Sequence, residues 1–208
     1  MPTKIGLISD VHATVTPLRE ALSMFQHEDV DLILCAGDIA GYGEELYQTC
    51  ELLIKSNCQM VSGNHDVWFL NNLVSEEEKS IGAFLRKLPF SFELTVEGKH
   101  LYLVHASPPS SQMEGITLLD ESARVLLNQK KRWAAYLKNF EYDVLVIGHT
   151  HQVFAEQLCD TLVINPGSTK FNHTCFILDL PDMKVRMFPL SNKTPLKVWN
   201  WGAGLNIE

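Results

Sequence analysis

The sequence predicts a mixed α/β fold in which two β-sheets pack face to face with helices on the outside. Two patterns lead to this prediction: the N-terminal part alternates apolar strand patterns with helical patterns, and the C-terminal part contains several short strand patterns in succession. The chain has 208 residues, of which 46% are hydrophobic. We therefore expect residues 1–208 to form one domain with a substantial core.

The N-terminal part is predicted to alternate strands with helices. A helix is expected to open at Thr16, a good N-cap residue, with Pro17 at its first position. From Leu18 onward, apolar residues recur at helical spacing and form one stripe. This order calls for a parallel sheet with right-handed crossovers. The expected strands cover residues 5–8, 31–35 and 59–61, and a second helix covers 44–55.

The rest of the chain is predicted to mix a hairpin and further strands with two helices. Ser75 and the glutamates after it match a capping box, which is expected to start a helix running to about Leu88. Alternating apolar residues on either side of Glu97-Gly98-Lys99 predict a β-hairpin. A long loop over 106–120 is expected before a helix at 121–138. The remaining strands are expected at 143–147, 152–158, 161–164, 174–180 and 184–190.

The composition narrows the class of partner. The formal net charge of −8 argues against a general nucleic-acid binder, because such proteins usually carry a basic face. No apolar run reaches the length of a membrane span and no signal peptide precedes the first strand, so we expect a cytoplasmic protein that does not enter a membrane.

The five cysteines are scattered and lack metal-site spacing. Trp199 and Trp201 are expected to cover core edges or to anchor a contact in a homo-oligomer.

Polar residues with metal-binding side chains follow five of the predicted strands. The carboxyl ends of parallel strands meet at one edge of a sheet, where α/β folds place their sites. These residues offer oxygen and imidazole donors without cysteine, a combination that suits two divalent ions such as Mn, Fe, Ni or Zn. The five motifs are Asp10-Val11-His12, Gly37-Asp38, Gly63-Asn64-His65-Asp66, Val104-His105 and Gly148-His149-Thr150-His151.

Each motif alone has an ordinary alternative. Asp and Asn favour turns, so Gly-Asp or Gly-Asn can mark a simple turn, and His149 and His151 could form a surface pair. The order of all five motifs, each after an apolar strand, favours a shared site. The glycines before Asp38, Asn64 and His149 are expected to permit sharp turns that point these side chains inward.

Together the five motifs resemble the signature of the calcineurin-like metallophosphoesterase superfamily, which runs D-x-H, G-D, G-N-H-[DE], H and G-H-x-H. The match extends from Asp10 to His151. It implies a four-layer α/β/β/α sandwich and a binuclear metal centre, in which a metal-bridging hydroxide attacks phosphorus. The ligands that it implies are Asp10, His12 and His151 for one ion, Asn64, His105 and His149 for the other, and Asp38 as a bridge between the two.

The resemblance leaves His65 off the metals, as the residue that stabilises the transition state or protonates the leaving oxygen. We expect the neighbouring Asp66 to raise the share of imidazolium, so that the two residues form the catalytic pair. A structural histidine is the alternative for His65. Gly41-Tyr42-Gly43 resembles a segment of small prokaryotic members, in which Tyr42 either lines the pocket or packs beneath it. Residues 165–168 resemble a loop that approaches the active site, although a simple turn between strands would also explain them.

The expected activity is hydrolysis of a small-molecule phosphoester, above all a phosphodiester. The segment after Asp38 lacks the arginine of protein phosphatases, which would grip a phosphate dianion through two hydrogen bonds. A monoanionic diester needs less positive charge, and the loop 106–120 is expected to form the wall around its leaving group. The alternatives are a phosphomonoesterase acting on nucleotides or proteins, and a scaffold that binds metal without catalysis.

Overall fold

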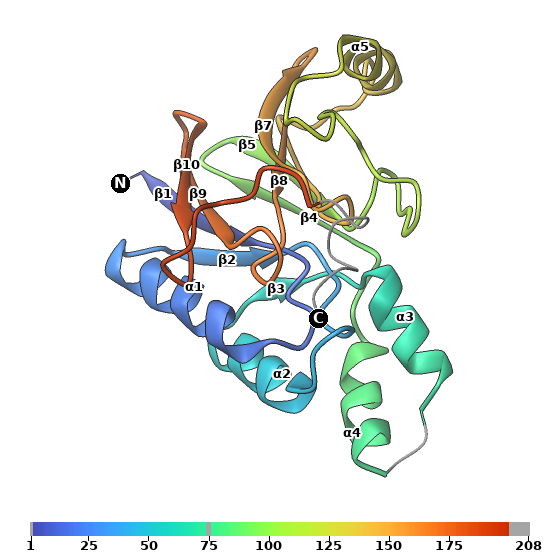
Figure 1. Ribbon diagram of the computed structural model, residues 1–208. Helices are drawn as coiled ribbons and strands as arrows, with labels where there is room; N and C mark the ends of the chain where they lie inside the picture. The colour runs from blue at the N-terminus through green and yellow to red at the C-terminus, as the bar shows by residue number, and fades with distance from the viewer. Residues whose placement is uncertain (1, 74–75, 200–208) are drawn as a thin grey trace.

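The computed structural model describes residues 2–73 and 76–199. Within these residues the first sheet has five strands in the order β10-β9-β1-β2-β3 (Figure 1). Strands β1, β2 and β3 run parallel, and β9 and β10 are antiparallel to their neighbours. The predicted alternation of strands and helices at the N-terminal end is confirmed. The elements are β1 (Thr3–Ile8), α1 (Val15–His27), β2 (Leu32–Cys35), α2 (Leu46–Lys55), β3 (Gln59–Met60), β9 (Thr174–Leu180) and β10 (Lys184–Pro189).

The second sheet has five described strands in the order β4-β5-β6-β8-β7. Its first two strands form the predicted hairpin, whose turn residues Glu97 and Gly98 both have positive φ, at 49° and 75°. Parallel pairing also occurs in this sheet, where β5, β6 and β8 run parallel to one another. The strands are β4 (Ser91–Val96), β5 (Lys99–Val104), β6 (Val144–Val146), β7 (Val153–Leu158) and β8 (Thr161–Pro166).

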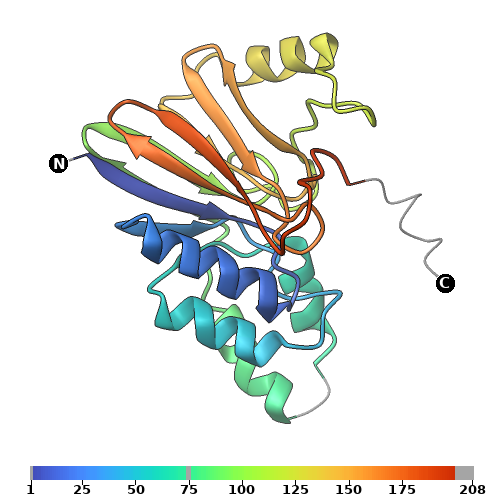
Figure 2. The same ribbon diagram turned by 60° about the vertical axis from the view of Figure 1, so that its left-hand side comes forward.

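Three separate layers of apolar side chains hold the sheets and helices together. Successive residues of a strand point to opposite faces, so Ile5 of β1 lies between the sheets while Ile8 packs toward α1. In β5, Leu103 lies between the sheets, and Tyr102 packs on the outer side with Trp133. Figure 2 shows α1 and α2 over one outer face, and the helix that carries Trp133 beyond the other. The predicted α/β/β/α sandwich is confirmed.

Of the two helices predicted after residue 74, one differs from the prediction and the other could be tested only in part. Helix α5 (Leu127–Tyr136) begins later than residue 121. The Asp120 carboxylate accepts hydrogen bonds from the amides of Ser122 and Arg124, at 2.8 and 2.9 Å, and these bonds stabilise a turn instead of a helix. Helix α4 (Glu76–Leu85) lies where a helix was predicted, but Ser75 is outside the described residues.

One helix was not predicted from the sequence, and the start of another was misplaced. Helix α3 (Asn64–Asn71) lies in a segment for which no helix was expected, shortly after β3, and its N-cap is Gly63. The N-cap of α1 is Thr14 and not Thr16, because the extended residue before the helix is Thr14. None of the helices in the described part of the chain is long and apolar enough to cross a membrane.

Candidate metal centre and its pocket

The structure brings together the seven side chains that were predicted to bind metal. All of them follow the carboxyl ends of strands, and both sheets contribute. We refer to them as the candidate metal centre. In the first sheet they are Asp10 and His12 after β1, Asp38 after β2 and Asn64 after β3; in the second they are His105 after β5, and His149 and His151 after β6.

Asp10, His12 and His151 form one half of the candidate metal centre. The Nε2 atoms of the two histidines are 3.1 Å apart, and Nε2 of His151 lies 3.2 Å from Oδ1 of Asp10. One potential ligand atom from each residue lies within 4.8 Å of the others, which is close enough for a single ion to reach all three. All three side chains are buried.

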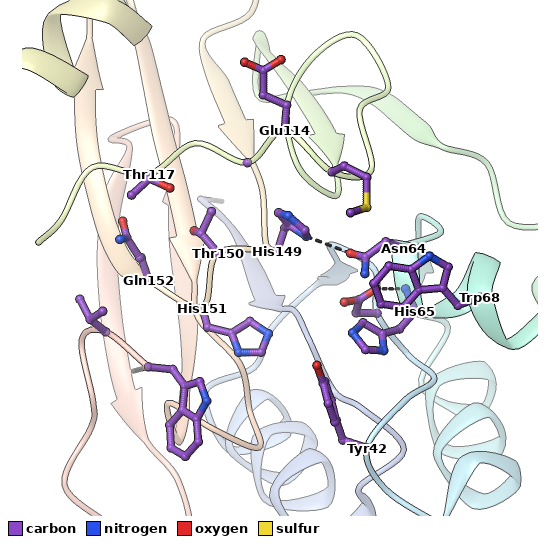
Figure 3. Close-up of a pocket in the computed structure, with 15 residues that line it drawn as sticks. Tyr42, Asn64, His65, Trp68, Glu114, Thr117, His149, Thr150, His151 and Gln152 are labelled. Carbon is purple, nitrogen blue, oxygen red and sulfur yellow. Dashed lines mark hydrogen bonds between the residues drawn. The ribbon is translucent and has the colours of Figure 1, made fainter. Parts of the chain in front are cut away.

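Asn64, His105 and His149 form the other half. The amide Oδ1 of Asn64 lies 3.0 Å from Nε2 of His105 and 2.9 Å from Nδ1 of His149. Figure 3 shows His149 and Asn64 side by side, pointing toward each other. Imidazole nitrogens and an amide oxygen are acceptable ligands for divalent transition metals, so this half could also hold an ion.

The carboxylate of Asp38 lies between the two halves. Its Oδ1 is 3.4 Å from Nε2 of His105, and its Oδ2 is 4.0 Å from Nε2 of His12. The amide of His65 donates a hydrogen bond to Oδ1 at 2.8 Å, which helps to orient the group. One carboxylate oxygen therefore faces each half, an arrangement suited to a bridging ligand.

Hydrogen bonds to main-chain carbonyls orient two of the imidazoles. The Nδ1 of His105 lies 2.7 Å from the carbonyl of Ala36, and the Nδ1 of His12 lies 3.1 Å from that of Ala40. Since a carbonyl only accepts, each Nδ1 carries a proton, and each Nε2 is directed toward Asp38 as the nitrogen that a metal ion would bind. Acceptors that face one another in a buried site need a proton or a cation between them. The donor set therefore fits a site for divalent cations.

Five residues of the candidate metal centre have a main-chain conformation that is unusual for residues other than glycine. Their φ angles lie in the left-handed region, which costs free energy and is uncommon for residues other than glycine. The residues are Asp10 (51°), His12 (49°), Asp38 (53°), His149 (66°) and His151 (47°). The fold thus holds these turns in a strained conformation at the place where the ligands converge.

The glycines of the motifs serve different purposes. Gly37 has a φ of 86°, so it adopts the sharp turn that was expected. Gly63 and Gly148 do not have a positive φ, so the expectation of a glycine-specific turn is wrong for these two residues. They are required for space, because a Cβ at Gly63 would collide with Asp38, and a Cβ at Gly148 would collide with Ser9.

Burial and neighbouring charges act together on the titratable groups. Burial raises the pKa of Asp10, but the nearby histidines, His151 first, outweigh burial and hold this pKa well below its ordinary value. Burial lowers the pKa of His12 to about 4, against the influence of Asp10 and Asp38. Burial also acts to lower the pKa of His105, yet Asp38 outweighs it and raises the pKa to about 9. Charged carboxylates thus persist in a buried site, where a bound cation would stabilise them.

The comparison with known families covers most of the chain. The calcineurin-like phosphoesterase superfamily domain matches residues 3–182. The chain belongs to this superfamily. The resemblance inferred from the five motifs is thereby confirmed, and divalent metals are the cofactors that the donor set fits.

This phosphoesterase has relatives in the archaeon Methanocaldococcus jannaschii. Phosphodiesterase MJ0936 is 25% identical over 172 residues, which are 79% of this chain and 82% of that protein. The uncharacterized protein MJ0912 is 27% identical over 180 residues, which are 78% of this chain and 68% of that protein. The metallophosphoesterase from Sphaerobacter thermophilus has a similar structure, with a TM-score of 0.68 at 20% identity over 92% of this chain and 89% of that chain. This last similarity establishes the fold alone.

His65 lies beside the candidate metal centre, in the first turn of α3. Its ring contacts that of His12, with 4.9 Å between the ring centroids. One nitrogen of His65 also lies within 4.8 Å of potential ligand atoms of His12 and Asp38. Burial lowers the pKa of His65, and Asp38 and Asp10 oppose this effect. His65 is thus placed to act on a group bound at the metal centre.

Asp66 is buried and its carboxylate binds the main chain. Its Oδ1 accepts a hydrogen bond from the amide of Ala40 at 2.7 Å, and its Oδ2 accepts one from the amide of Gly63 at 2.8 Å. Asp66 therefore ties the start of α3 to the segment after β2. The expected rise in the imidazolium share of His65 is not found, since the pKa of that residue is lowered. A catalytic role for Asp66 stays a prediction.

The candidate metal centre forms one side of a pocket of about 660 Å³. Tyr42 lines this pocket, which favours the first of its two predicted roles. The loop 106–120 contributes part of the wall of this pocket, and its contact with a leaving group stays a prediction. Figure 3 shows Tyr42, His65 and Trp68 on one side, opposite Thr150 and Gln152. The lining residues from the loop are Met113, Glu114, Gly115 and Thr117.

Two functional contributions were missed or undervalued in the sequence. The loop 165–168 was explained sufficiently by a turn, but Ser168 Oγ donates to the carbonyl of Asp10 at 2.6 Å and Asn165 Nδ2 donates to the carbonyl of Gly148 at 2.9 Å. The loop therefore positions two ligand-bearing segments. Trp68 was not singled out, because a tryptophan in an apolar run resembles an ordinary core residue.

Proposed function

We propose that this phosphoesterase hydrolyses a small phosphodiester at a centre of two divalent metal ions. The observation that carries the proposal is the convergence of seven side chains inside the fold. Their oxygen and nitrogen atoms, which can bind metal, face one another at short distances. The superfamily and the phosphodiesterase among the relatives support the same class of reaction.

The seven donors divide into two sets with one shared carboxylate. The short distances within each set, and the position of Asp38 between them, support this division. Two divalent ions held by these sets would neutralise phosphate charge and would supply a water of lowered pKa as the nucleophile toward phosphorus. Mn, Ni, Fe and Zn suit the mixed nitrogen and oxygen donors. The proposed sets are Asp10, His12 and His151, and Asn64, His105 and His149, with Asp38 as the bridge.

His65 is proposed to stabilise the transition state or to protonate the leaving oxygen. The position of the His65 ring supports this role, because the ring contacts His12 and lines the pocket. A histidine side chain can accept or donate a proton in general acid–base catalysis. We infer that Asp66 acts indirectly, by holding the main chain on both sides of this residue.

The charge of the pocket favours a diester over a monoester. The described residues that line it include Asp38 and Glu114 but no lysine or arginine. A monoester dianion would require a cation in addition to the metals, whereas a diester carries a single negative charge. Lys170 is the cation that could contact a monoester, because its Nζ lies 6.0 Å from the ring centroid of Tyr42, which lines the pocket.

A metal reconstitution experiment tests the proposal. The protein is treated with a chelator and then supplied separately with Mn, Ni, Zn or Mg, and the bound metal is counted by elemental analysis. We expect chelation to abolish hydrolysis, and Mn or Ni to restore it with two ions per chain. The reconstituted protein should cleave bis(p-nitrophenyl) phosphate with a higher kcat/KM than p-nitrophenyl phosphate. Both substrates release p-nitrophenolate, so the comparison reports on the phosphate and not on the leaving group.

Two outcomes would contradict the proposal. Metal binding without hydrolysis of any phosphoester would indicate a scaffold instead of an enzyme. A monoester that reacts tenfold better than the diester, a difference of about 1.4 kcal/mol in transition-state free energy, would indicate a phosphomonoesterase.

A further inference from the structure

The pocket exposes an aromatic surface that metal binding itself does not require. Trp68 is 47% exposed and Tyr42 is 55% exposed, and both line the pocket beside the candidate metal centre. The ring of His65 lies between them, 4.6 Å from Tyr42 and 4.7 Å from Trp68 between centroids. We call these three residues the aromatic wall (Figure 3). Exposed aromatic groups at the edge of a concave site are a common sign of ligand contact.

The position of Trp68 follows from the register of α3. Residues three apart on a helix lie on the same face, so the helix that presents His65 to the pocket also presents Trp68. The two apolar residues that follow, Phe69 and Leu70, pack instead against the hydrophobic core between the helices and the first sheet. Burying an indole would stabilise the protein, so its exposure at the pocket calls for another explanation than packing.

A second tryptophan of the pocket has a different environment. The ring of Trp199 lies 4.8 Å from that of Phe171, which in turn stacks on His151 with an interplanar angle of 25°. Trp199 thus supports a segment of the candidate metal centre. The ring contact of Trp68 within the described residues is with His65, at an interplanar angle of 61°. This steep contact leaves indole surface open to the pocket.

We propose that Trp68 determines substrate specificity by stacking on a planar heteroaromatic ring, so that the substrate is a phosphodiester of the nucleotide type. The inference rests on the proposed function, because it places the ring beside a phosphate held at the metal centre. Nucleobases stack on tryptophan regardless of their hydrogen-bonding edges, which suits a wall made of rings. Because His65 lies between Trp68 and His12, the ring belongs to the ester group on the His65 side of phosphorus.

Calorimetric titration with two monophosphates tests this assignment. Adenosine 5′-monophosphate and ribose 5-phosphate carry the same phosphate and sugar and differ in the base. With Mn-loaded protein we expect the first to bind about tenfold more tightly, which corresponds to about 1.4 kcal/mol. Trp68→Ala should remove this difference without changing the affinity for ribose 5-phosphate, and Trp68→Phe should keep most of it. Tyr47→Ala is the matched control, because it removes a 53% exposed aromatic from α2 and should change neither affinity.

The titration separates this inference from the proposed function. If Trp68→Ala keeps the preference for the base, or weakens both ligands equally, Trp68 is not a stacking residue. Circular dichroism melting shows whether each variant is folded. A protein that shows the Trp68-dependent preference but hydrolyses no phosphodiester would overturn the proposed function and leave the stacking site standing. A protein that hydrolyses diesters without any preference for the base would overturn the stacking site alone.

Discussion

The candidate metal centre and the aromatic wall share one pocket, yet they are built in opposite ways. Six of the seven residues of the metal centre are buried, and they come from both sheets. The aromatic wall comes from α3 and the segment after β2, and its two largest rings are about half exposed. The first arrangement restricts movement of the ligands, and the second leaves side chains that can change without disturbing the core.

This difference suggests a division of work within the pocket. Groups that must contact every phosphoester are mostly buried, while Tyr42 and Trp68, which would select among substrates, are about half exposed. Substitutions in the metal centre should therefore affect all substrates alike, and substitutions in the aromatic wall should change the preference among them. The following predictions test that distinction, from the largest expected effect to the smallest.

Asp38→Asn should have the largest effect. The substitution removes the carboxylate charge that faces both halves of the metal centre, so repulsion between two ions would no longer be offset. We expect loss of bound metal by elemental analysis and a fall of several orders of magnitude in the hydrolysis of every substrate. Asp182→Asn, at an exposed position, is the matched control and should retain both. An Asp38→Asn protein with two metals and normal turnover would show that Asp38 is no bridge.

His65→Ala should have an intermediate effect, because this residue belongs to the aromatic wall but contacts the metal centre. Metal content should be unchanged, and turnover should fall by about 10²–10⁴-fold, the range for loss of a general acid or base. The loss should be smaller for diesters whose leaving groups need no proton. A comparison of p-nitrophenyl and alkyl leaving groups measures this dependence. Equal losses with both would assign His65 an electrostatic or structural role instead of proton donation.

Trp199→Ala should have the smallest effect on function. Because Trp199 packs on Phe171, which stacks on His151, the variant should lose packing and not recognition. We expect a melting temperature lower by about 5 °C, equivalent to about 1–2 kcal/mol in a chain of this size. The preference for adenosine 5′-monophosphate over ribose 5-phosphate should persist. If the Trp199→Ala variant loses that preference in the calorimetric titration, Trp199 also contacts the base, and recognition involves both sides of the pocket.

The sequence by itself determined the family, the four-layer fold and the identity of the residues that converge. This was possible because each motif follows an apolar strand, and strand ends meet at a sheet edge in any fold of this class. Local spacing also located the hairpin at Glu97 and Gly98, where both turn residues must adopt positive φ. It could not distinguish Trp68 from Phe69, since both belong to one apolar run and only packing separates them.

Only the tertiary structure decided how the residues of the site hold one another. The carboxylate of Asp66 binds the amide of Ala40, far from it in the chain, which no pattern around Asp66 indicates. Likewise, Ser168 binds the main chain of Asp10 across 158 residues, and Gly63 is required by the nearness of Asp38 and not by a turn. Periodicity and turn chemistry act between neighbours in sequence, whereas these contacts form only when the fold brings segments that are distant in sequence within a few ångströms of each other.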